Sequence, residues 1–147
     1  MIALVQRVSY ARVFLFGELY SEIGEGLLVL VGIERKDSTV NAERLVDKLL
    51  AYRIFGDAQG KMNLSVKDTE GDVMLVSQFT LAADTNKGLR PSFSSAKPPQ
   101  EAEKIFKHLV DFAKHEYPKI NTGKFGADMQ ISLENNGNFG EIMLKSI

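Results

Sequence analysis

The residues best suited to do chemistry are Ser77, Gln78 and Thr80, which follow a run of apolar residues. The sequence predicts a strand over Val73–Leu81, and the end of this strand brings two hydroxyls and one carboxamide to the rim of a sheet. Ligands of open α/β proteins bind beside such strand ends. An ordinary edge strand also favours Thr and Phe for their β propensity, so the segment alone leaves both interpretations open.

Two further segments contain residues that could contact a ligand. A turn-rich loop from Ala82 to Phe93 follows the strand and carries Lys87 and Arg90. Cations beside a polar strand end can bind phosphates, although charged loop residues more often only keep a loop soluble. Thr122–Met129 holds two glycines among apolar residues, which indicates close approach of the backbone to another strand or to a ligand.

Several kinds of catalytic site are absent from the sequence. The chain has no cysteine, which excludes thiolate catalysis, disulfides and metal sites that need sulfur. Its two histidines, His108 and His115, fall in one predicted helix, and we expect solvated surface residues there rather than catalytic bases. No Walker loop, HExxH motif or strand-linked GxGxxG motif occurs, and no carboxylates are spaced as metal ligands. We therefore expect neither a metal nor another cofactor.

The strands that must position these segments are predicted from apolar and β-branched runs. They are Met1–Val8, Ala11–Phe16, Leu19–Ile23, Leu27–Ile33, Val73–Leu81, Met129–Leu133 and Ile142–Ile147. Leu27–Ile33 is apolar on both faces, which is typical of a central strand that is covered on both sides. Asn136-Gly137 predicts a two-residue hairpin turn between the last two strands.

Two amphipathic helices are predicted from apolar residues that recur three and four positions apart. The first begins after Asp37 or Ser38, which suit an N-cap, and is expected to end at Gly56. The second begins at Pro98-Pro99 and ends before Pro118. About seven strands and two helices predict a layered α/β fold of mixed β-sheets, in which sheet packs on sheet as well as helix on sheet.

Length and composition indicate one globular domain over residues 1–147, with 44% hydrophobic and 25% charged residues. A net charge of −1 argues against a wide duplex-binding face and leaves a small footprint on nucleic acid open. The longest apolar stretch, Leu27–Ile33, is far shorter than the ~20 residues that span a membrane. Met1–Val5 is too short for the apolar region of a signal peptide, so we expect a cytoplasmic protein without a membrane partner.

Short motifs occur in order from Met1 to about Gly137. They are Gln6-Arg7-Val8, Tyr52-Arg53-Ile54-Phe55, Gly60-Lys61-Met62-Asn63-Leu64, Ser77-Gln78-Phe79-Thr80-Leu81-Ala82, Arg90-Pro91-Ser92-Phe93, Thr122-Gly123 and Ala127-Asp128-Met129-Gln130. Together they closely resemble those of the D-aminoacyl-tRNA deacylases. The resemblance implies a homodimer with that family's fold that hydrolyses the ester between a D-amino acid and the 3′ end of tRNA. It also implies removal of glycine from alanine tRNA, with assistance from the 2′-OH of the terminal ribose.

The resemblance also implies site residues. Thr80 and Gln78 are the expected catalytic residues, and Thr80 should position the ester rather than attack it, because an unactivated hydroxyl needs a base to become a nucleophile. Contacts with the aminoacyl-adenosine are expected from Ser77, Phe79, Met129, Ala127 and Arg7. Phe79 is also expected near the core. Candidates for contacting tRNA phosphates are Arg53, Lys87 and Arg90.

The chain departs from the family at Gly137-Asn138. The family closes with Asn-x-Gly-Pro, and its cis Gly-Pro bond enters the partner subunit's pocket, where the carbonyls exclude L side chains. Here the chain has Asn138 instead of proline, and a cis bond costs ~3–4 kcal/mol before such a residue against about 0.5–1 before proline. Dimer packing could hold a strained cis bond, but we expect a trans bond and a weakened rejection of L-aminoacyl-tRNA.

Three functions follow from this departure. The first is a deacylase of D-aminoacyl-tRNA and glycyl-tRNA. The second is a deacylase with relaxed chirality, because Gly137-Asn138 replaces Gly-Pro. The third is a non-catalytic dimeric module that binds the tRNA end, and the intact Ser77–Thr80 motif argues against it.

Overall fold

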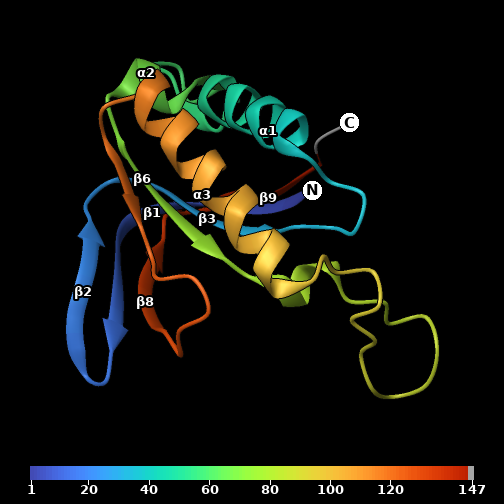
Figure 1. Cartoon of the computed structure of the whole chain (residues 1–147). Helices are drawn as coiled ribbons and strands as arrows, with labels where there is room; N and C mark the ends of the chain where they lie inside the picture. The colour runs from blue at the N-terminus through green and yellow to red at the C-terminus, as the bar shows by residue number, and fades with distance from the viewer. Residues whose placement is uncertain (146–147) are drawn as a thin grey trace.

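The computed structural model describes residues 1–145, which form a strongly curved seven-stranded sheet with helices against one face (Figure 1). The strands of this sheet are β1 (Ile2–Leu15), β2 (Glu18–Ile23), β3 (Gly26–Gly32), β6 (Asp72–Ser77), β7 (Ile120–Thr122), β8 (Gln130–Asn135) and β9 (Glu141–Lys145). Their order is β2-β1-β3-β6-β7, and β8 and β9 both pair with β1. Residues 146 and 147 of the predicted last strand lie outside the described residues. A separate short hairpin joins β4 (Phe55–Gly56) and β5 (Met62–Leu64).

β1 is one strand of 14 residues, so the prediction of separate strands over Met1–Val8 and Ala11–Phe16 is wrong. Its first half pairs with β3 and β9, and its second half pairs with β2 and β8. The register of the β8 ladder shifts between Val8 and Tyr10, and such an irregularity lets a long strand bend without ending. One continuous strand therefore supports both halves of the sheet.

β8 and β9 lie end to end along one edge of β1 and do not form the predicted hairpin. Asn136-Gly137 does turn the chain, with φ of +78° at Gly137, but each flanking strand finds its partner in β1. Residues 136–140 therefore loop out between β8 and β9 at the level of Arg7, whose backbone N–H donates to the Gly140 carbonyl over 2.6 Å.

Both predicted long helices are present. α1 (Thr39–Ala51) begins after Ser38, whose N–H donates to the Asn41 side chain over 2.9 Å, and it ends at Tyr52 rather than at Gly56 because the backbone of Tyr52 is already extended. α3 (Pro99–Glu116) has the predicted bounds. The sequence did not predict α2 (Val66–Thr69) or the 3₁₀ helix η1 (Phe79–Ala82).

Apolar side chains pack on both faces of the sheet. One cluster lies between the sheet and the two long helices and includes Val29, Leu49 and Leu109. A second cluster lies inside the curve of the sheet, where Val13 and Met74 meet side chains of β8. Figure 1 shows α1 and α3 together over the upper part of the sheet, with the strands β2 and β8 at its lower left. The predicted layered α/β class with mixed sheets is confirmed, and no described helix is long and apolar enough to cross a membrane.

Candidate active site

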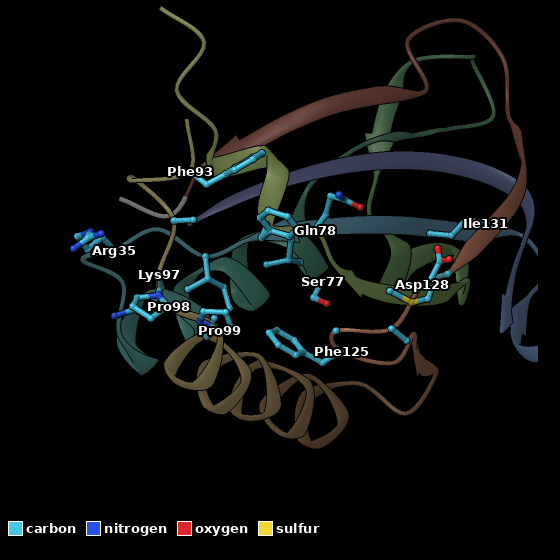
Figure 2. Close-up of a pocket in the computed structure, with 18 residues that line it drawn as sticks. Arg35, Ser77, Gln78, Phe93, Lys97, Pro98, Pro99, Phe125, Asp128 and Ile131 are labelled. Atoms are coloured by element: carbon cyan, nitrogen blue, oxygen red, sulfur yellow. The ribbon is translucent and has the colours of Figure 1, made fainter. Parts of the chain in front are cut away.

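A cavity of about 810 Å³ opens at the carboxyl end of β6, between η1, the start of α3 and the loop before β8 (Figure 2). Five residues predicted from the sequence line it: Ser77, Gln78, Phe79, Ala127 and Met129. Most of the remaining wall is apolar, as in most small-molecule sites. The strand end and the glycine-containing segment, which are about 50 residues apart in the chain, therefore meet around one hollow.

β6 ends at Ser77, and the chain then turns into η1, so the prediction of a strand through Leu81 is wrong. The Gln78 N–H makes the last bond to β3, 2.7 Å from the Val31 carbonyl. Gly32 allows the turn to pack against β3, because a Cβ there would lie 2.8 Å from the Leu81 Cβ. The close approach of these two backbones turns the polar motif away from the sheet.

Thr80, the predicted catalytic threonine, is not among the residues that line the cavity, and its hydroxyl accepts a hydrogen bond from the lining residue Gln78 through Nε2 over 2.6 Å. Among residues 1–145, Gln78 is the side-chain partner of this hydroxyl, and no general base is bonded to it. His108 instead contacts Glu43 on α1 at 3.2 Å, and His115 contacts Glu116 at 3.4 Å. Both histidines sit on α3, as the sequence predicts.

Phe79 is 60% exposed, so the expectation that it lies near the core is wrong. Its ring meets the ring of Phe93 edge to face, with the centroids 5.0 Å apart. Both rings line the cavity. The Phe79 side chain points outward because β6 ends before it, at Ser77, and η1 has begun. Phe79 and Phe93 together form an aromatic wall of the cavity.

The opposite wall comes from the segment 123–129. Gly123 is buried, and a Cβ there would lie 2.7 Å from the Met129 sulfur and 3.4 Å from Val76. The missing side chain therefore makes room for Met129 against β6, which confirms the predicted close approach to another strand at Gly123, whereas a Cβ at Gly126 would meet nothing within 4 Å. Phe125 packs against Phe106 of α3 with the ring centroids 5.9 Å apart.

The family model described as D-Tyr-tRNA(Tyr) deacylase matches residues 4–144. The chain belongs to this family. A D-aminoacyl-tRNA deacylase of Pseudomonas aeruginosa (strain LESB58) is 56% identical over 137 residues, which cover 93% of this chain and 94% of that protein. A D-aminoacyl-tRNA deacylase of Nitrosococcus oceani is 55% identical over 93% of this chain and 88% of that protein.

Two solved structures share the deacylase fold of this chain. One is named "c-Myc DNA Unwinding Element Binding Protein"; it is 39% identical, with a TM-score of 0.93 over 100% of this chain and 99% of that one. The other is described as a probable eukaryotic D-amino acid tRNA deacylase, with a TM-score of 0.85 and 97% of each chain covered. At 16% identity the second likeness concerns the fold alone.

The charged residues that line the cavity of this deacylase family member are Arg35, Lys97 and Asp128, none of which the sequence analysis singled out as a site residue. Figure 2 shows Arg35 and Lys97 toward one end and Asp128 toward the other. The Lys97 side chain is only 12% exposed and lies 3.9 Å from Glu101. The phosphate candidates predicted from the sequence do not line this cavity: Arg53, Lys87 and Arg90.

Arg7 lies away from the cavity and holds the loop of residues 136–140. Its Nε and Nη2 donate to the Asn136 carbonyl at 3.0 and 2.7 Å, and Nη2 also donates to the Asn138 carbonyl at 3.1 Å. Nη1 donates to the Ile54 carbonyl at 2.6 Å. The described residues contain no cis peptide bond, which confirms the predicted trans bond between Gly137 and Asn138. The deacylase motif residue Arg7 thus positions the segment in which this chain departs from its family.

Residues 1–145 contain no group of three or more His, Cys, Asp or Glu side chains that could hold a metal ion. The residues that line the cavity offer hydroxyl, amide and backbone groups, one carboxylate and two cations.

Proposed function

We propose that the D-aminoacyl-tRNA deacylation which family membership gives this enzyme takes place in the cavity at the end of β6, on cytoplasmic tRNA. The observation that carries this proposal is the meeting of Ser77–Phe79 and Ala127–Met129 around one cavity in a chain that matches the family over residues 4–144. The cavity size suits an aminoacyl-adenosine end. Removal of glycine from alanine tRNA in the same cavity belongs to the proposal.

The site acts by orienting the ester and polarising its carbonyl. Phe79 and Thr80 begin η1, and the first N–H groups of a helix have no acceptor within it. These two groups are suited to donate to the carbonyl oxygen as it gains negative charge. Donors placed in this way contribute several kcal/mol to catalysis, and correct orientation contributes more.

Water is the nucleophile in this mechanism. It attacks the ester carbonyl while the 2′-OH of the terminal ribose relays the proton, and the bond from the acyl carbon to the 3′ oxygen then breaks. The products are the free amino acid and tRNA with a 3′-OH. Asp128, the one carboxylate among the lining residues, is available to accept hydrogen bonds from the α-ammonium group of the substrate.

The loop of residues 136–140 supports two further parts of the proposal. The enzyme is a homodimer, and it rejects L-aminoacyl-tRNA less strictly than its family does. Residues 136–139 of the loop are exposed, and Phe139 is 81% exposed. Facing a partner's cavity, it would act as the stereochemical filter, as the resemblance implies. Because Gly137-Asn138 is trans, its carbonyls point differently from those of a cis bond, and we expect slow but measurable hydrolysis of L-aminoacyl-tRNA. Family membership favours both enzymatic alternatives over a binding module.

The test of the location uses Ala127→Phe, which fills the cavity, and Ala51→Phe, which adds the same ring at an exposed position on α1. We expect the first variant to lose turnover of D-tyrosyl-tRNA while it keeps its fold, and the second to behave as wild type. The test of the mechanism uses D-tyrosyl-tRNA that ends in 3′-esterified 2′-deoxyadenosine. We expect its rate of hydrolysis to be lower by a factor of about 100 or more. Wild-type kcat/KM in Ala127→Phe would contradict the proposed site.

A further inference from the structure

A second cleft, of about 630 Å³, lies on the far side of Phe125, between α3 and the segment that follows β7. Phe125 lines both this cleft and the cavity at the end of β6. Phe125 is therefore a wall that the two hollows share. Because they are neighbours, a long substrate with its end in the cavity can extend toward the second cleft.

Positive charge gathers in the second cleft, although the whole chain has a net charge of −1. Lys104, Lys107 and Lys124 line it, against a single carboxylate, that of Glu103. Lys107 is bound to Asp111 over 2.7 Å, whereas no ion pair of Lys104 or Lys124 occurs among the described residues. Two exposed ammonium groups on opposite walls are thus available for a polyanion.

An exposed aromatic ring completes the cleft. Tyr20 of β2 is 49% exposed and lines the same hollow as Lys104 and Lys124. Proteins that bind single-stranded nucleic acid combine a basic groove along the backbone with aromatic rings on which bases stack. Lysine contributes a point charge that holds a phosphate without selecting a base, so this combination fits a strand bound without regard to its sequence.

We propose that the second cleft binds the nucleotide that precedes the esterified adenosine in the single-stranded 3′ tail of tRNA. Lys104 and Lys124 bind its phosphates, and its base stacks on Tyr20. The inference rests on the proposed function, because it takes the cavity at the end of β6 as the seat of the terminal adenosine. It gives the enzyme a contact with tRNA that an isolated aminoacyl-adenosine cannot make.

The experiment compares D-tyrosyl-tRNA with D-tyrosyl-adenosine as substrates of wild type and of the Lys104→Ala/Lys124→Ala double variant. We expect the double variant to raise KM for the tRNA about tenfold with little change in kcat, and to leave hydrolysis of the adenosine ester unchanged. The slope of log KM against log salt should fall by about 1.4, since each phosphate contact on a single strand contributes ~0.7. Lys114→Ala, an exposed lysine of α3 outside both cavities, is the matched control.

Tyr20→Ala and Tyr20→Phe test the stacking separately, because only the second keeps the ring. We expect Tyr20→Ala to raise KM for the tRNA about fivefold or more and Tyr20→Phe to retain the wild-type value. An unchanged KM in the lysine variant, or equal losses on both substrates, would overturn the inference while leaving the proposed function intact. Wild-type protein that hydrolyses neither substrate would overturn the proposed function and the inference with it.

Discussion

The side-chain amide of Gln78 donates to the hydroxyl of Thr80 over 2.6 Å. The amide N–H occupies one lone pair of the hydroxyl oxygen, and the amide nitrogen is not basic enough to accept the proton of the hydroxyl. The opposite orientation of the amide would let its oxygen accept from the hydroxyl, but an amide oxygen is not a general base either. The pair therefore orients Thr80 as a hydrogen-bonding group and does not activate it for attack.

Thr80→Val tests this role, because it keeps the shape of the side chain and deletes the hydroxyl. We expect kcat for D-tyrosyl-tRNA to fall less than about tenfold, which is the loss of one positioning hydrogen bond. Single-turnover kinetics measure the effect, with Thr80→Ser as the variant that restores the hydroxyl. Complete loss of turnover with normal tRNA affinity would instead identify Thr80 as the nucleophile.

Phe79→Ala separates the function of this ring from stability. Because Phe79 is 60% exposed and packs mainly on Phe93, we expect its loss to lower the free energy of unfolding by about 0.5–1.5 kcal/mol, the value of one aromatic pair. The value of kcat/KM for D-tyrosyl-tRNA should fall by more than this loss of stability explains, since the ring lines the cavity. Urea unfolding of Phe79→Ala, Phe93→Ala and the double variant measures the pair directly. A loss of ~3–5 kcal/mol, typical of a core aromatic, would contradict the exposed position.

Arg7→Lys tests how the loop of residues 136–140 is held. An ammonium group cannot reproduce the fork that reaches the carbonyls of Ile54, Asn136 and Asn138. We expect faster amide hydrogen exchange in the loop and a lower ratio of D- to L-tyrosyl-tRNA hydrolysis. Arg12→Lys is the control, since Arg12 is exposed and its contacts are with Glu22 at 3.4 Å and with the Tyr10 ring at 4.6 Å rather than with the loop. Unchanged exchange and an unchanged ratio would show that Arg7 does not support the loop.

Tyr117→Phe makes a prediction about pH. Burial, with smaller contributions from Asp72 and Glu70, raises the pKa of Tyr117 above its ordinary value of 10.0. Above that pH the unfolded tyrosine ionises while the folded one keeps its proton. The unfolded state then binds fewer protons, so the free energy of unfolding falls as the pH rises.

The Tyr117 hydroxyl also donates to the Gly71 carbonyl over 2.5 Å. We therefore expect Tyr117→Phe to cost about 1–2 kcal/mol near neutral pH and to flatten the alkaline decline in stability. Urea unfolding at several pH values between about 8 and 11 checks both effects. An identical pH dependence in the variant would show that Tyr117 does not cause the decline.

Elements with a strong pattern of their own could be predicted from the sequence. The apolar stripe of α3 and the continuous apolar run of β3 were found with nearly the right bounds. The misplaced hairpin at Asn136-Gly137 has a physical cause: the turn forms, but β1 offers 14 residues of backbone with which β8 and β9 can pair. No local pattern shows which partner a strand will choose.

The sequence likewise predicted some residues of the candidate site and not others. Motif resemblance found Ser77 and Met129, which the fold brings to one cavity. It did not find Arg35 and Lys97, because they reach the cavity through a tertiary pairing, the β-bridge between Glu34 and Ala96. Contacts of this kind depend on the whole fold and leave no mark in the flanking residues.

The most direct test of the account is deacylation of matched D-tyrosyl-, L-tyrosyl- and glycyl-tRNA by the purified protein. We expect rapid hydrolysis of the D-tyrosyl and glycyl esters, and hydrolysis of the L-tyrosyl ester that is slower but above the rate in buffer, because Gly137-Asn138 is trans. Full sparing of L-tyrosyl-tRNA would contradict the relaxed filter alone. If D-tyrosyl-tRNA survives as long with the protein as in buffer, the result would contradict the activity of the protein as a D-aminoacyl-tRNA deacylase.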